Sequence, residues 1–274
     1  MNPHQALSSG QVFLWYRRNG FWYGVDGSVI LRVDDAGNVE SSGPDAPPDF
    51  FRYTDDLSAI TASLSQNDLL RNVIDRYPDM RITRQAFFQC VISFVVSANS
   101  NIPRIRQNLQ AICDRFGDVA HMDDMAFSTF PGPDILASAD IADIASCGTG
   151  YRSRYIQQTS AAIRDGFLGV DELRRMPYKE ARQSLTMLPG VGNKVADCIM
   201  LFSLDFLEAV PMDRWLVRVL HTRYGIGDGS TPGTDRVYDK LHDQAVRLLG
   251  PYAGYAQQYL FKMIREDSGK TLKW

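Results

Sequence analysis

The most informative segment of the sequence is Leu188-Pro189-Gly190-Val191-Gly192-Asn193-Lys194-Val195-Ala196-Asp197-Cys198. Pro189 ends the helix predicted over residues 178–187, because a proline has no backbone N–H to donate. Gly190 and Gly192 permit a tight turn, and a second helix is predicted over residues 193–205. Two helices joined by a glycine hairpin present backbone N–H groups at a helix N-terminus, which suits a phosphate group. Taken alone, the hairpin is more typical of a plain turn between two helices, with glycine present for steric reasons.

The residues that follow the hairpin are candidates for chemistry. Lys194 falls in the first turn of the second helix, beside the positive end of the helix dipole. That position, together with burial, predicts a lowered pKa for the amine, which a nucleophilic lysine needs. Asp213 stands directly before a helix predicted over residues 214–224. It is either a plain N-cap or a carboxylate that helix N–H groups keep ionised and aimed at a developing positive charge.

An antiparallel sheet is predicted in the first fifty residues. Aromatic and β-branched residues in partial alternation predict strands over residues 11–18, 21–25 and 28–34, with a further strand from Val39. The pairs Asn19-Gly20 and Asp26-Gly27 separate the first three strands and are strong hairpin signals. Residues 42–50 are rich in Pro and Asp and are predicted to be a connector.

Helices are predicted from Thr54 onward. The stretch Thr54-Asp55-Asp56 and the residue Ser65 are candidate N-caps. Residues 85–99 include no charged side chain and are apolar on nearly every side, which is typical of a helix at the centre of a domain. The other predicted helices cover residues 102–116, 151–165, 235–249 and 253–266.

Length and composition are those of a globular protein. The chain has 274 residues, of which 45% are hydrophobic, and this is enough for one large domain or two smaller ones. We expect an α+β fold, with a small N-terminal antiparallel β-sheet domain over residues 1–53. A compact all-helical domain that contains the helix-hairpin-helix is expected over residues 54–274.

Charge is distributed unevenly along the chain. The formal net charge is −3, which by itself argues mildly against a nucleic-acid partner. Residues 34–79 hold ten acidic and three basic residues, whereas residues 151–182 hold seven basic and four acidic residues. A local basic face can bind phosphate even in an acidic protein, although a solvated helix face produces the same pattern.

The cysteines and the termini indicate an ordinary cytoplasmic protein. Cys90, Cys113, Cys147 and Cys198 are widely spaced and form no CxxC pair, so the pattern is not that of a zinc site, an iron–sulfur cluster or a disulfide framework. We expect these cysteines to be small core residues. The N-terminus shows no signal-peptide pattern, and no apolar stretch is long enough to cross a membrane. The expected location is therefore the cytoplasm.

The hairpin and the stretch Val210-Pro211-Met212-Asp213 closely resemble motifs of the helix-hairpin-helix, Gly/Pro-Asp superfamily of DNA glycosylases. Within that superfamily the chain resembles the 8-oxoguanine DNA glycosylase family. Four more motifs occur in the family's order: Ser9-Gly10-Gln11-Val12-Phe13-Leu14-Trp15, Ser97-Ala98-Asn99-Ser100-Asn101-Ile102-Pro103-Arg104-Ile105, Gly150-Tyr151-Arg152-Ser153-Arg154-Tyr155 and Gly250-Pro251-Tyr252-Ala253-Gly254-Tyr255-Ala256-Gln257. The resemblance covers nearly the whole chain and is far more specific than the hairpin alone.

The resemblance implies a bifunctional DNA glycosylase/AP lyase that excises 8-oxoguanine from duplex DNA, preferably opposite cytosine. Lys194 matches the lysine that attacks C1′ of the damaged nucleotide and forms a Schiff base, after which β-elimination cuts the strand. Asp213 matches the aspartate that stabilises the oxocarbenium-like charge and orients the lysine. No metal or other cofactor is required, although the carbonyls of Leu188 and Val191 are candidate ligands for a monovalent cation. The implied partner is damaged double-stranded DNA, bound by a monomer without any membrane association.

The resemblance also implies how the damaged base is held once it has left the base stack. Cys198 and Phe261 are expected to sandwich the base, and Gln257 to read its Watson–Crick edge. The carbonyl of Gly10 is expected to accept a hydrogen bond from N7–H of 8-oxoguanine. Undamaged guanine has a lone pair at N7, which a carbonyl repels. Without the resemblance, Cys198 and Phe261 read as core residues and Gln257 as a surface residue.

Further residues are implied to contact the DNA duplex. Asn99 and Tyr151 match positions that fill the vacated stack, and Arg104 and Arg152 match positions that donate to O2 and N3 of the opposite cytosine. Arg154 is interpreted as a phosphate contact. The implied DNA-binding set is therefore Asn99, Arg104, Tyr151, Arg152, Gly190 and Gly192.

Three positions depart from the family pattern. Trp215 stands where a histidine is frequent, Ile264 replaces an aspartate and Ser100 replaces an asparagine. These changes affect the pocket wall and a phosphate contact, and so bear on substrate preference. Two alternatives follow: a related glycosylase for other damaged purines, or a non-catalytic hairpin module that binds DNA. Lys194 argues against a monofunctional glycosylase for alkylated bases, which would keep Asp213 but would not need the lysine. The presence of both Lys194 and Asp213 argues against the non-catalytic module, whose hairpin needs only the glycines.

Overall fold

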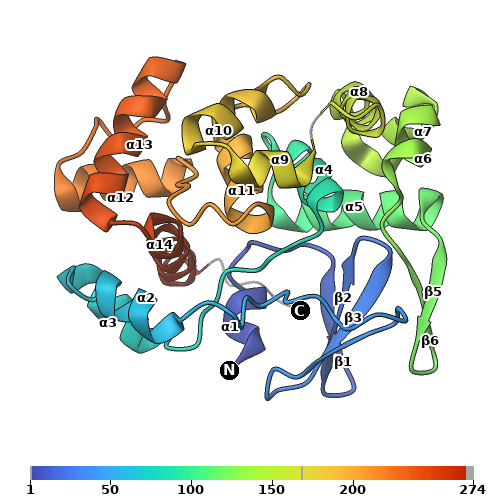
Figure 1. Cartoon of the computed structure of the whole chain (residues 1–274), viewed down its shortest axis with the longest axis horizontal. Coiled ribbons are helices and arrows are strands. Elements are labelled where there is room, and N and C mark those ends of the chain that lie inside the picture. Colours follow the sequence, from blue (N-terminus) through green and yellow to red (C-terminus); the bar gives the residue numbers. More distant parts are fainter. Residues whose placement is uncertain (1, 168, 270–274) are drawn as a thin grey trace.

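The computed structural model describes residues 2–167 and 169–269, and it shows a small sheet beneath a larger body of helices (Figure 1). A short helix, α1 (Pro3–Leu7), precedes the sheet. The strands are β1 (Trp15–Arg18), β2 (Phe21–Asp26), β3 (Val29–Val33) and β4 (Val39–Ser41), and they pair in chain order, each antiparallel to the next. The predicted α+β fold class, with an antiparallel sheet at the N-terminus, is confirmed.

The two predicted hairpin turns are present, and a further glycine is needed within β2. Asn19 and Gly20 have φ values of 51° and 84°, and Gly27 has 63°, the left-handed region that tight hairpins require. Gly24 pairs directly with Trp15. A Cβ on Gly24 would lie 2.1 Å from the Trp15 ring, so only glycine lets the indole lie flat across β2.

The first strand begins at Trp15 rather than at residue 11, because Gln11 lies in a buried connection. Its side-chain amide donates to the carbonyl of Ala6 at 3.1 Å and to that of Arg81 at 2.9 Å. Its Oε1 accepts from the backbone N–H of Thr83 at 2.8 Å. These bonds fix the turn over residues 8–10 against the segment that leads into the helices, and they take the place of a strand ladder.

One face of the sheet shares a core with the helices. Tyr23, Val25 and Ile30 belong to the same buried cluster as the helical core, whereas a second cluster around Trp15 and Trp22 covers the other face. The sheet is therefore packed against the helices rather than tethered to them. The division of the chain into domains at residue 53 stays a prediction.

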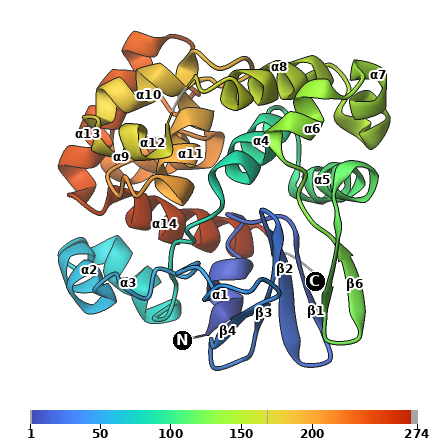
Figure 2. The ribbon, with the colours of Figure 1, turned by 45° about the vertical axis from the view of Figure 1, so that its right-hand side comes forward.

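The helices surround one apolar helix, α4, as its composition predicts. They are α2 (Leu57–Leu64), α3 (Asp68–Arg76), α4 (Phe87–Ser97), α5 (Ile102–Phe116), α6 (Pro133–Ser138), α7 (Ile141–Ile144), the π-helical turn η1 (Ala145–Thr149), α8 (Arg152–Arg164), α9 (Val170–Arg175), α10 (Tyr178–Thr186), α11 (Asn193–Ser203), α12 (Arg214–Tyr224), α13 (Asp235–Leu249) and α14 (Ala253–Asp267). Helix α4 packs against α5, α8 and α11. In Figure 2, α14 runs between the upper helices and the pair α2–α3. None of the described helices is long and apolar enough to cross a membrane.

The caps of the first two helices after the sheet differ in part from the sequence prediction. Asp56 is the N-cap of α2, as predicted, and its side chain accepts from the N–H of Ala59 at 3.0 Å. Ser65 is not an N-cap but the C-cap of α2. The N-cap of α3 is Asn67, which accepts from the N–H groups of Leu69 and Leu70.

A second, two-stranded sheet was not predicted. The strands β5 (Val119–Met122) and β6 (Met125–Ser128) form an antiparallel hairpin within a region predicted to be helical. Asp123, at its turn, accepts hydrogen bonds from the Tyr23 hydroxyl at 2.5 Å and from Arg32 at 2.8 Å. These contacts with the first sheet join residues about a hundred positions apart, so local sequence preference could not reveal them.

Candidate active site

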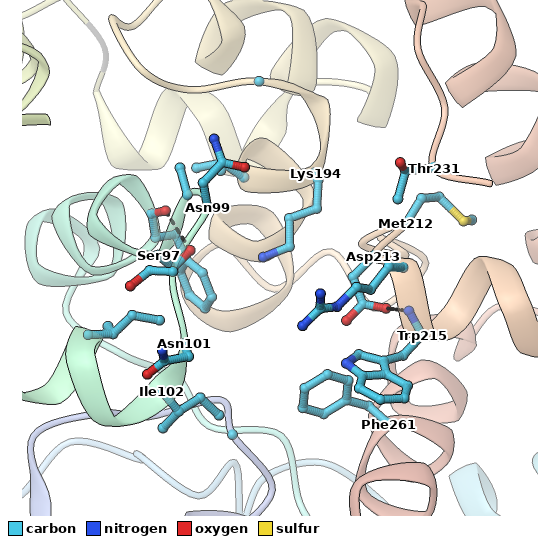
Figure 3. A pocket seen from close by; sticks show the side chains of 18 of the residues that line it. Ser97, Asn99, Asn101, Ile102, Lys194, Met212, Asp213, Trp215, Thr231 and Phe261 are labelled. Atoms are coloured by element: carbon cyan, nitrogen blue, oxygen red, sulfur yellow. Dashed lines mark hydrogen bonds between the residues drawn. The ribbon is translucent and has the colours of Figure 1, made fainter. Parts of the chain in front are cut away.

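The two predicted catalytic residues line one cavity of about 1650 Å³. The cavity lies where the N-termini of α11 and α12, the segment that enters α5, and α14 meet (Figure 3). Of the residues predicted from the sequence, the lining includes Gly10, Asn99, Arg104, Gly192, Lys194, Asp213 and Phe261. The other predicted side chains and the first hairpin glycine stand outside the lining: Tyr151, Arg152, Gly190, Cys198 and Gln257.

Lys194 and Asp213 come from two helix N-termini and point into the same cavity (Figure 3). Lys194 is the second residue of α11, and its Nζ lies 5.4 Å from the centre of the Phe94 ring. Asp213 is the N-cap of α12, and its Oδ1 accepts from the N–H groups of Trp215 at 3.0 Å and Leu216 at 2.8 Å. The other carboxylate oxygen, Oδ2, takes part in neither of these two bonds and can interact with a ligand in the cavity.

The pKa of Lys194 is raised, so the prediction of a lowered pKa is wrong. Burial, the largest single influence, does lower the pKa of the amine. Cys198, one turn further along α11, and the carboxylate of Asp213 raise the pKa and together outweigh burial. Asp213 lies in a different helix, and its proximity could not be read from the position of Lys194 alone. In the DNA-free protein the lysine is therefore held as an ammonium.

Burial also raises the pKa of the Asp213 carboxyl above its ordinary value. The N–H of Leu216, the ammonium of Lys194 and the N–H of Trp215 act in the opposite direction. The predicted hold of the helix N–H groups on the carboxylate is present. Burial nevertheless has the larger effect, and it makes Asp213 a stronger proton acceptor than an exposed aspartate.

The two hairpin glycines have different surroundings. Gly190 has φ +82°, and a Cβ there would lie 2.9 Å from the Cβ of Tyr155, so the turn is pressed against α8. The carbonyl of Pro189 accepts from Thr159 of α8 at 2.7 Å. Gly192, the N-cap of α11, has φ −95°, and no atom of the described residues beyond its chain neighbours lies within 4 Å of the position that a Cβ would take. Gly190 therefore serves the packing of the hairpin, whereas Gly192 leaves the helix N-terminus open to a ligand.

The predicted cation site lies in the same turn. The carbonyl of Leu188 accepts from the N–H of Val191 at 3.1 Å, which engages one of its two lone pairs. A monovalent cation on these two carbonyls stays a prediction. Among the described residues, no group of three or more His, Cys, Asp or Glu side chains could hold a metal ion.

Gly10 is fixed at the cavity wall by α14. Its φ is +88°, and a Cβ there would lie 2.9 Å from both Arg265 and Phe261 and 3.2 Å from Ile102. The preceding carbonyl, that of Ser9, accepts from the side chain of Gln258 at 2.9 Å. Glycine is therefore required for conformation and for space, and Gln258, which the sequence did not single out, holds the backbone beside it.

The three side chains predicted to bind the base lie on two helices, α11 and α14, beside the cavity. Phe261 lines the cavity, and Gln257 is buried one turn before it on α14. The Oε1 of Gln257 accepts no hydrogen bond from the described residues, which is costly for a buried acceptor. Cys198 is buried on α11, and burial raises the pKa of its thiol to about 11. Their sandwich around a base stays a prediction.

Asn99 and Tyr151 lie together on the protein surface. Asn99 has φ 51° and donates to the Tyr151 hydroxyl at 3.4 Å. Tyr151 is 58% exposed, an unusual state for so large an aromatic ring, and meets Tyr155 edge to face with ring centres 6.2 Å apart. Their predicted filling of a vacated base stack stays a prediction.

Arg104 and Arg152, which are both predicted to contact the opposite cytosine, differ in burial and in hydrogen bonding. Arg104 is exposed at the cavity rim. Arg152 is buried, and it donates to the carbonyl of Ala98 at 2.8 Å and to that of Asn99 at 3.2 Å. Its guanidinium also lies 4.6 Å from the centre of the Tyr151 ring. Arg152 thus supports the backbone at Ala98 and Asn99 and lies beside the Tyr151 ring, and its donation to cytosine stays a prediction.

A buried network behind the cavity was not predicted. The Tyr238 hydroxyl donates to Asp197 of α11 at 2.5 Å and accepts from the N–H of Met212 at 3.2 Å. The Tyr178 hydroxyl donates to the other oxygen of Asp197 at 2.6 Å. Tyr238 therefore joins the helix that carries Lys194 to the residue before Asp213. No sequence signal marks Tyr238, because α13 has the pattern of an ordinary amphipathic helix.

Comparisons with known proteins agree with this arrangement. The N-glycosylase/DNA lyase OGG1 of Arabidopsis thaliana is 30% identical over 275 residues, which cover 93% of this chain and 75% of the plant protein. A structure of MBOgg1 with a low-affinity DNA ligand has a TM-score of 0.88 at 28% identity and covers 98% of this chain and 93% of its own. The 8-oxoguanine glycosylase/lyase of Clostridium acetobutylicum, bound to double-stranded DNA with cytosine opposite 8-oxoG, has a TM-score of 0.85 at 28% identity, with coverage of 98% and 93%. No protein-family model matches the chain.

The fold and the site together define a DNA glycosylase of the helix-hairpin-helix class. The likeness to the plant enzyme extends over most of both chains. The chain belongs to the OGG1 family of N-glycosylase/DNA lyases.

Proposed function

We propose that this protein is a bifunctional DNA glycosylase/AP lyase that excises 8-oxoguanine from double-stranded DNA, preferably opposite cytosine. The observation that carries the proposal is the meeting of Lys194 and Asp213 in one cavity, each at a helix N-terminus beside the hairpin. The family relationship supports the same activity. A non-catalytic hairpin module would not need this pair. The cytoplasm is the proposed location.

The proposed reaction begins with Lys194. Its neutral amine attacks C1′ of the damaged nucleotide, the bond from C1′ to N9 breaks, and the base leaves with the electron pair of that bond. Asp213 stabilises the positive charge that develops on the sugar. The bond from C1′ to O4′ then breaks, O4′ takes up a proton given up by the lysine nitrogen, and a Schiff base forms between that nitrogen and C1′. The Schiff base permits β-elimination, which removes a proton from C2′ and breaks the bond from C3′ to its oxygen. Because the pKa of Lys194 is raised, the ammonium must release a proton to solvent before the attack, and Asp213 keeps its negative charge for the developing cation on the sugar.

The proposed recognition of the base uses backbone and side chain together. The carbonyl of Gly10 accepts from N7–H of 8-oxoguanine and repels the lone pair of guanine. The buried Oε1 of Gln257, unsatisfied among the described residues, accepts from the N–H groups of the Watson–Crick edge. Phe261 and Cys198 cover the two faces of the ring. The open backbone at Gly192 and the exposed Arg154 contact phosphates.

Borohydride trapping tests the proposal. A duplex with a single 8-oxoguanine opposite cytosine should give a covalent adduct with the wild-type protein and none with Lys194→Ala. Asp213→Asn can still cap α12, so it should fold and bind the duplex while single-turnover excision falls about a hundredfold or more. Adduct of normal yield from Lys194→Ala would overturn the role of the lysine.

The pH dependence of the rate of adduct formation provides a second test of the role of Lys194. Only the neutral amine attacks, and the raised pKa leaves little of it at neutral pH, so the wild-type rate of adduct formation should increase from pH 6 to pH 8 by up to about tenfold for each pH unit. A rate that falls over this interval would mean that a group other than the lysine amine limits the reaction.

A further inference from the structure

Arg265 extends from α14 into the cavity wall at the place where the base is proposed to bind. It lies one turn after Phe261, and its guanidinium carbon is 5.4 Å from the centre of the Phe261 ring. One of its terminal nitrogens lies 2.9 Å from the position that a Cβ on Gly10 would take. The guanidinium therefore stands directly beside the backbone that is proposed to read N7.

Arg265 is also coupled to the catalytic end of the cavity. Burial lowers the pKa of its guanidinium, and the carboxylate of Asp213 acts against this effect. Both Asp213 and Arg265 belong to the cavity lining. The arginine is thus adjacent to Gly10 on one side and within the electrostatic reach of Asp213 on the other.

The order of atoms along a purine relates these two neighbours to the base. From the sugar, the edge of the base runs C1′, N9, C8 and then N7, and O6 lies beyond N7. Asp213 and Lys194 act at C1′, whereas Gly10 is proposed to act at N7. A group that is close to both Gly10 and Asp213 therefore faces C8, which in 8-oxoguanine carries an oxygen and in guanine carries only hydrogen.

We propose that Arg265 is a second specificity-determining residue, whose guanidinium donates a hydrogen bond to the oxygen at C8 of the flipped base. The proposal rests on the proposed function of the same site. A guanidinium bonded to a carbonyl oxygen is a charge-assisted donor, and guanine offers no acceptor at C8. Gly10 and Arg265 then recognise the two atoms, N7 and O8, at which the lesion differs from guanine.

The ring of Phe261 supports this role because it restrains the guanidinium. A cation beside an aromatic ring is attracted to it, and the planar guanidinium presents its N–H donors in a fixed fork, so fewer conformations are open to the side chain. An arginine that was free to reach past N7 would instead read O6 and N7 of guanine, the commonest arginine contact to a base. The carbonyl of Gly10 opposes that contact, because it repels the N7 lone pair of guanine.

The first experiment measures single turnovers of the whole protein on 8-oxoguanine opposite cytosine and on a preformed abasic site. Arg265→Met, which keeps the length of the side chain without its charge, should slow excision of 8-oxoguanine about ten- to a hundredfold, the effect of one charge-assisted hydrogen bond. Cleavage of the abasic site should stay within about twofold, because no base is present there. Arg247→Met, at an exposed position on α13, is the matched control and should change neither rate.

The second experiment distinguishes O8 from O6. In a Lys194→Gln background, which blocks catalysis, binding is measured for duplexes that carry 8-oxoguanine or 8-oxoadenine. Both bases have N7–H and O8, but 8-oxoadenine has an amino group in place of O6. Arg265→Met should weaken binding of both by a similar factor. Loss confined to 8-oxoguanine would overturn the proposal in favour of a contact to O6.

Two further outcomes are decisive. If Arg265→Met slows the cleavage of abasic sites as much as base excision, the arginine serves Asp213 or the fold, and the proposal is wrong; an unchanged melting temperature would separate those two roles. If the wild-type protein cleaves abasic sites but excises no 8-oxoguanine, the proposed function itself fails, and this result is independent of any variant at Arg265.

Discussion

At the scale of single residues, Arg104 and Arg152 carry the same guanidinium group in opposite surroundings. Arg104 is exposed at the rim of the cavity, where DNA can reach it. Arg152 is buried and already donates to the carbonyls of Ala98 and Asn99. Burying an arginine whose partners are backbone carbonyls stabilises the local chain, and removing it leaves those carbonyls unsatisfied.

Replacing each of the two arginines should therefore affect a different property of the enzyme. Arg104→Ala should reduce the ratio of excision opposite cytosine to excision opposite adenine by about tenfold, since a polar base contact contributes about 1–3 kcal/mol of discrimination. Arg152→Ala should lower the melting temperature and slow excision on both duplexes by the same factor. Single-turnover rates on the two duplexes and thermal unfolding check both statements. A change of opposite-base preference in Arg152→Ala with an unaltered melting temperature would contradict this prediction and indicate that Arg152 contacts cytosine directly.

At the scale of elements, the two glycines of the hairpin before α11 have different roles. Gly190 has a left-handed φ of +82° and is pressed against Tyr155, whereas Gly192 has φ −95° and open space around it. Glycine is thus needed at residue 190 for the fold, whereas at residue 192 it leaves space for a ligand.

This difference predicts a matched pair of variants. Gly190→Ala should lose about 1–3 kcal/mol of stability, the cost of forcing a side chain into a strained conformation and a close contact. Gly192→Ala should leave the melting temperature nearly unchanged but weaken binding to undamaged duplex DNA, because its methyl group faces the proposed phosphate. Thermal unfolding and fluorescence anisotropy at fixed salt measure the two effects. Equal stability losses in both variants would show that Gly192 is also structural.

At the scale of the whole molecule, a buried carboxyl group joins three helices behind the catalytic residues. Asp197 on α11 accepts from Tyr178 on α10 and Tyr238 on α13. Burial raises the pKa of Asp197 from 3.8 to about 7, although the two hydroxyl groups and Arg182 act to lower it. Folding therefore favours the protonated form of this carboxyl group.

The raised pKa makes stability depend on pH in a definite direction. Below pH 4 the carboxyl is protonated in both states, and between pH 4 and pH 7 only the unfolded chain releases the proton, so the contribution of Asp197 to stability decreases as pH rises. Asp197→Asn removes this titration. The melting temperature of the variant relative to wild type should increase by about 5 °C or more from pH 5 to pH 8.

Asp165→Asn is a suitable control, because Asp165 is exposed and its pKa is lowered by Arg164. Its melting temperature relative to wild type should not increase over the same interval. A constant difference between Asp197→Asn and wild type from pH 5 to pH 8 would mean that Asp197 does not titrate there and that the network is an ion-pair cluster instead.

Features that are local in the chain could be predicted from the amino-acid sequence. The hairpin, the N-cap at Asp213 and the bounds of α5, α12 and α13 follow from turn, capping and periodicity signals within a few residues. The family was likewise readable, because its motifs are short segments in a fixed order. These features depend on backbone preferences and on neighbours along the chain, which a sequence states directly.

Features that depend on residues far apart in the chain became visible only in the folded protein. The pKa of Lys194 rises because the carboxylate of Asp213 reaches it from another helix, and Arg152 is buried because the carbonyls of Ala98 and Asn99 surround its guanidinium. The positions of Tyr238 and Arg265 at the cavity depend on how α13 and α14 pack. Electrostatic and hydrogen-bond energies depend on separation in space, and no local pattern records which segments the fold brings within a few ångströms of one another.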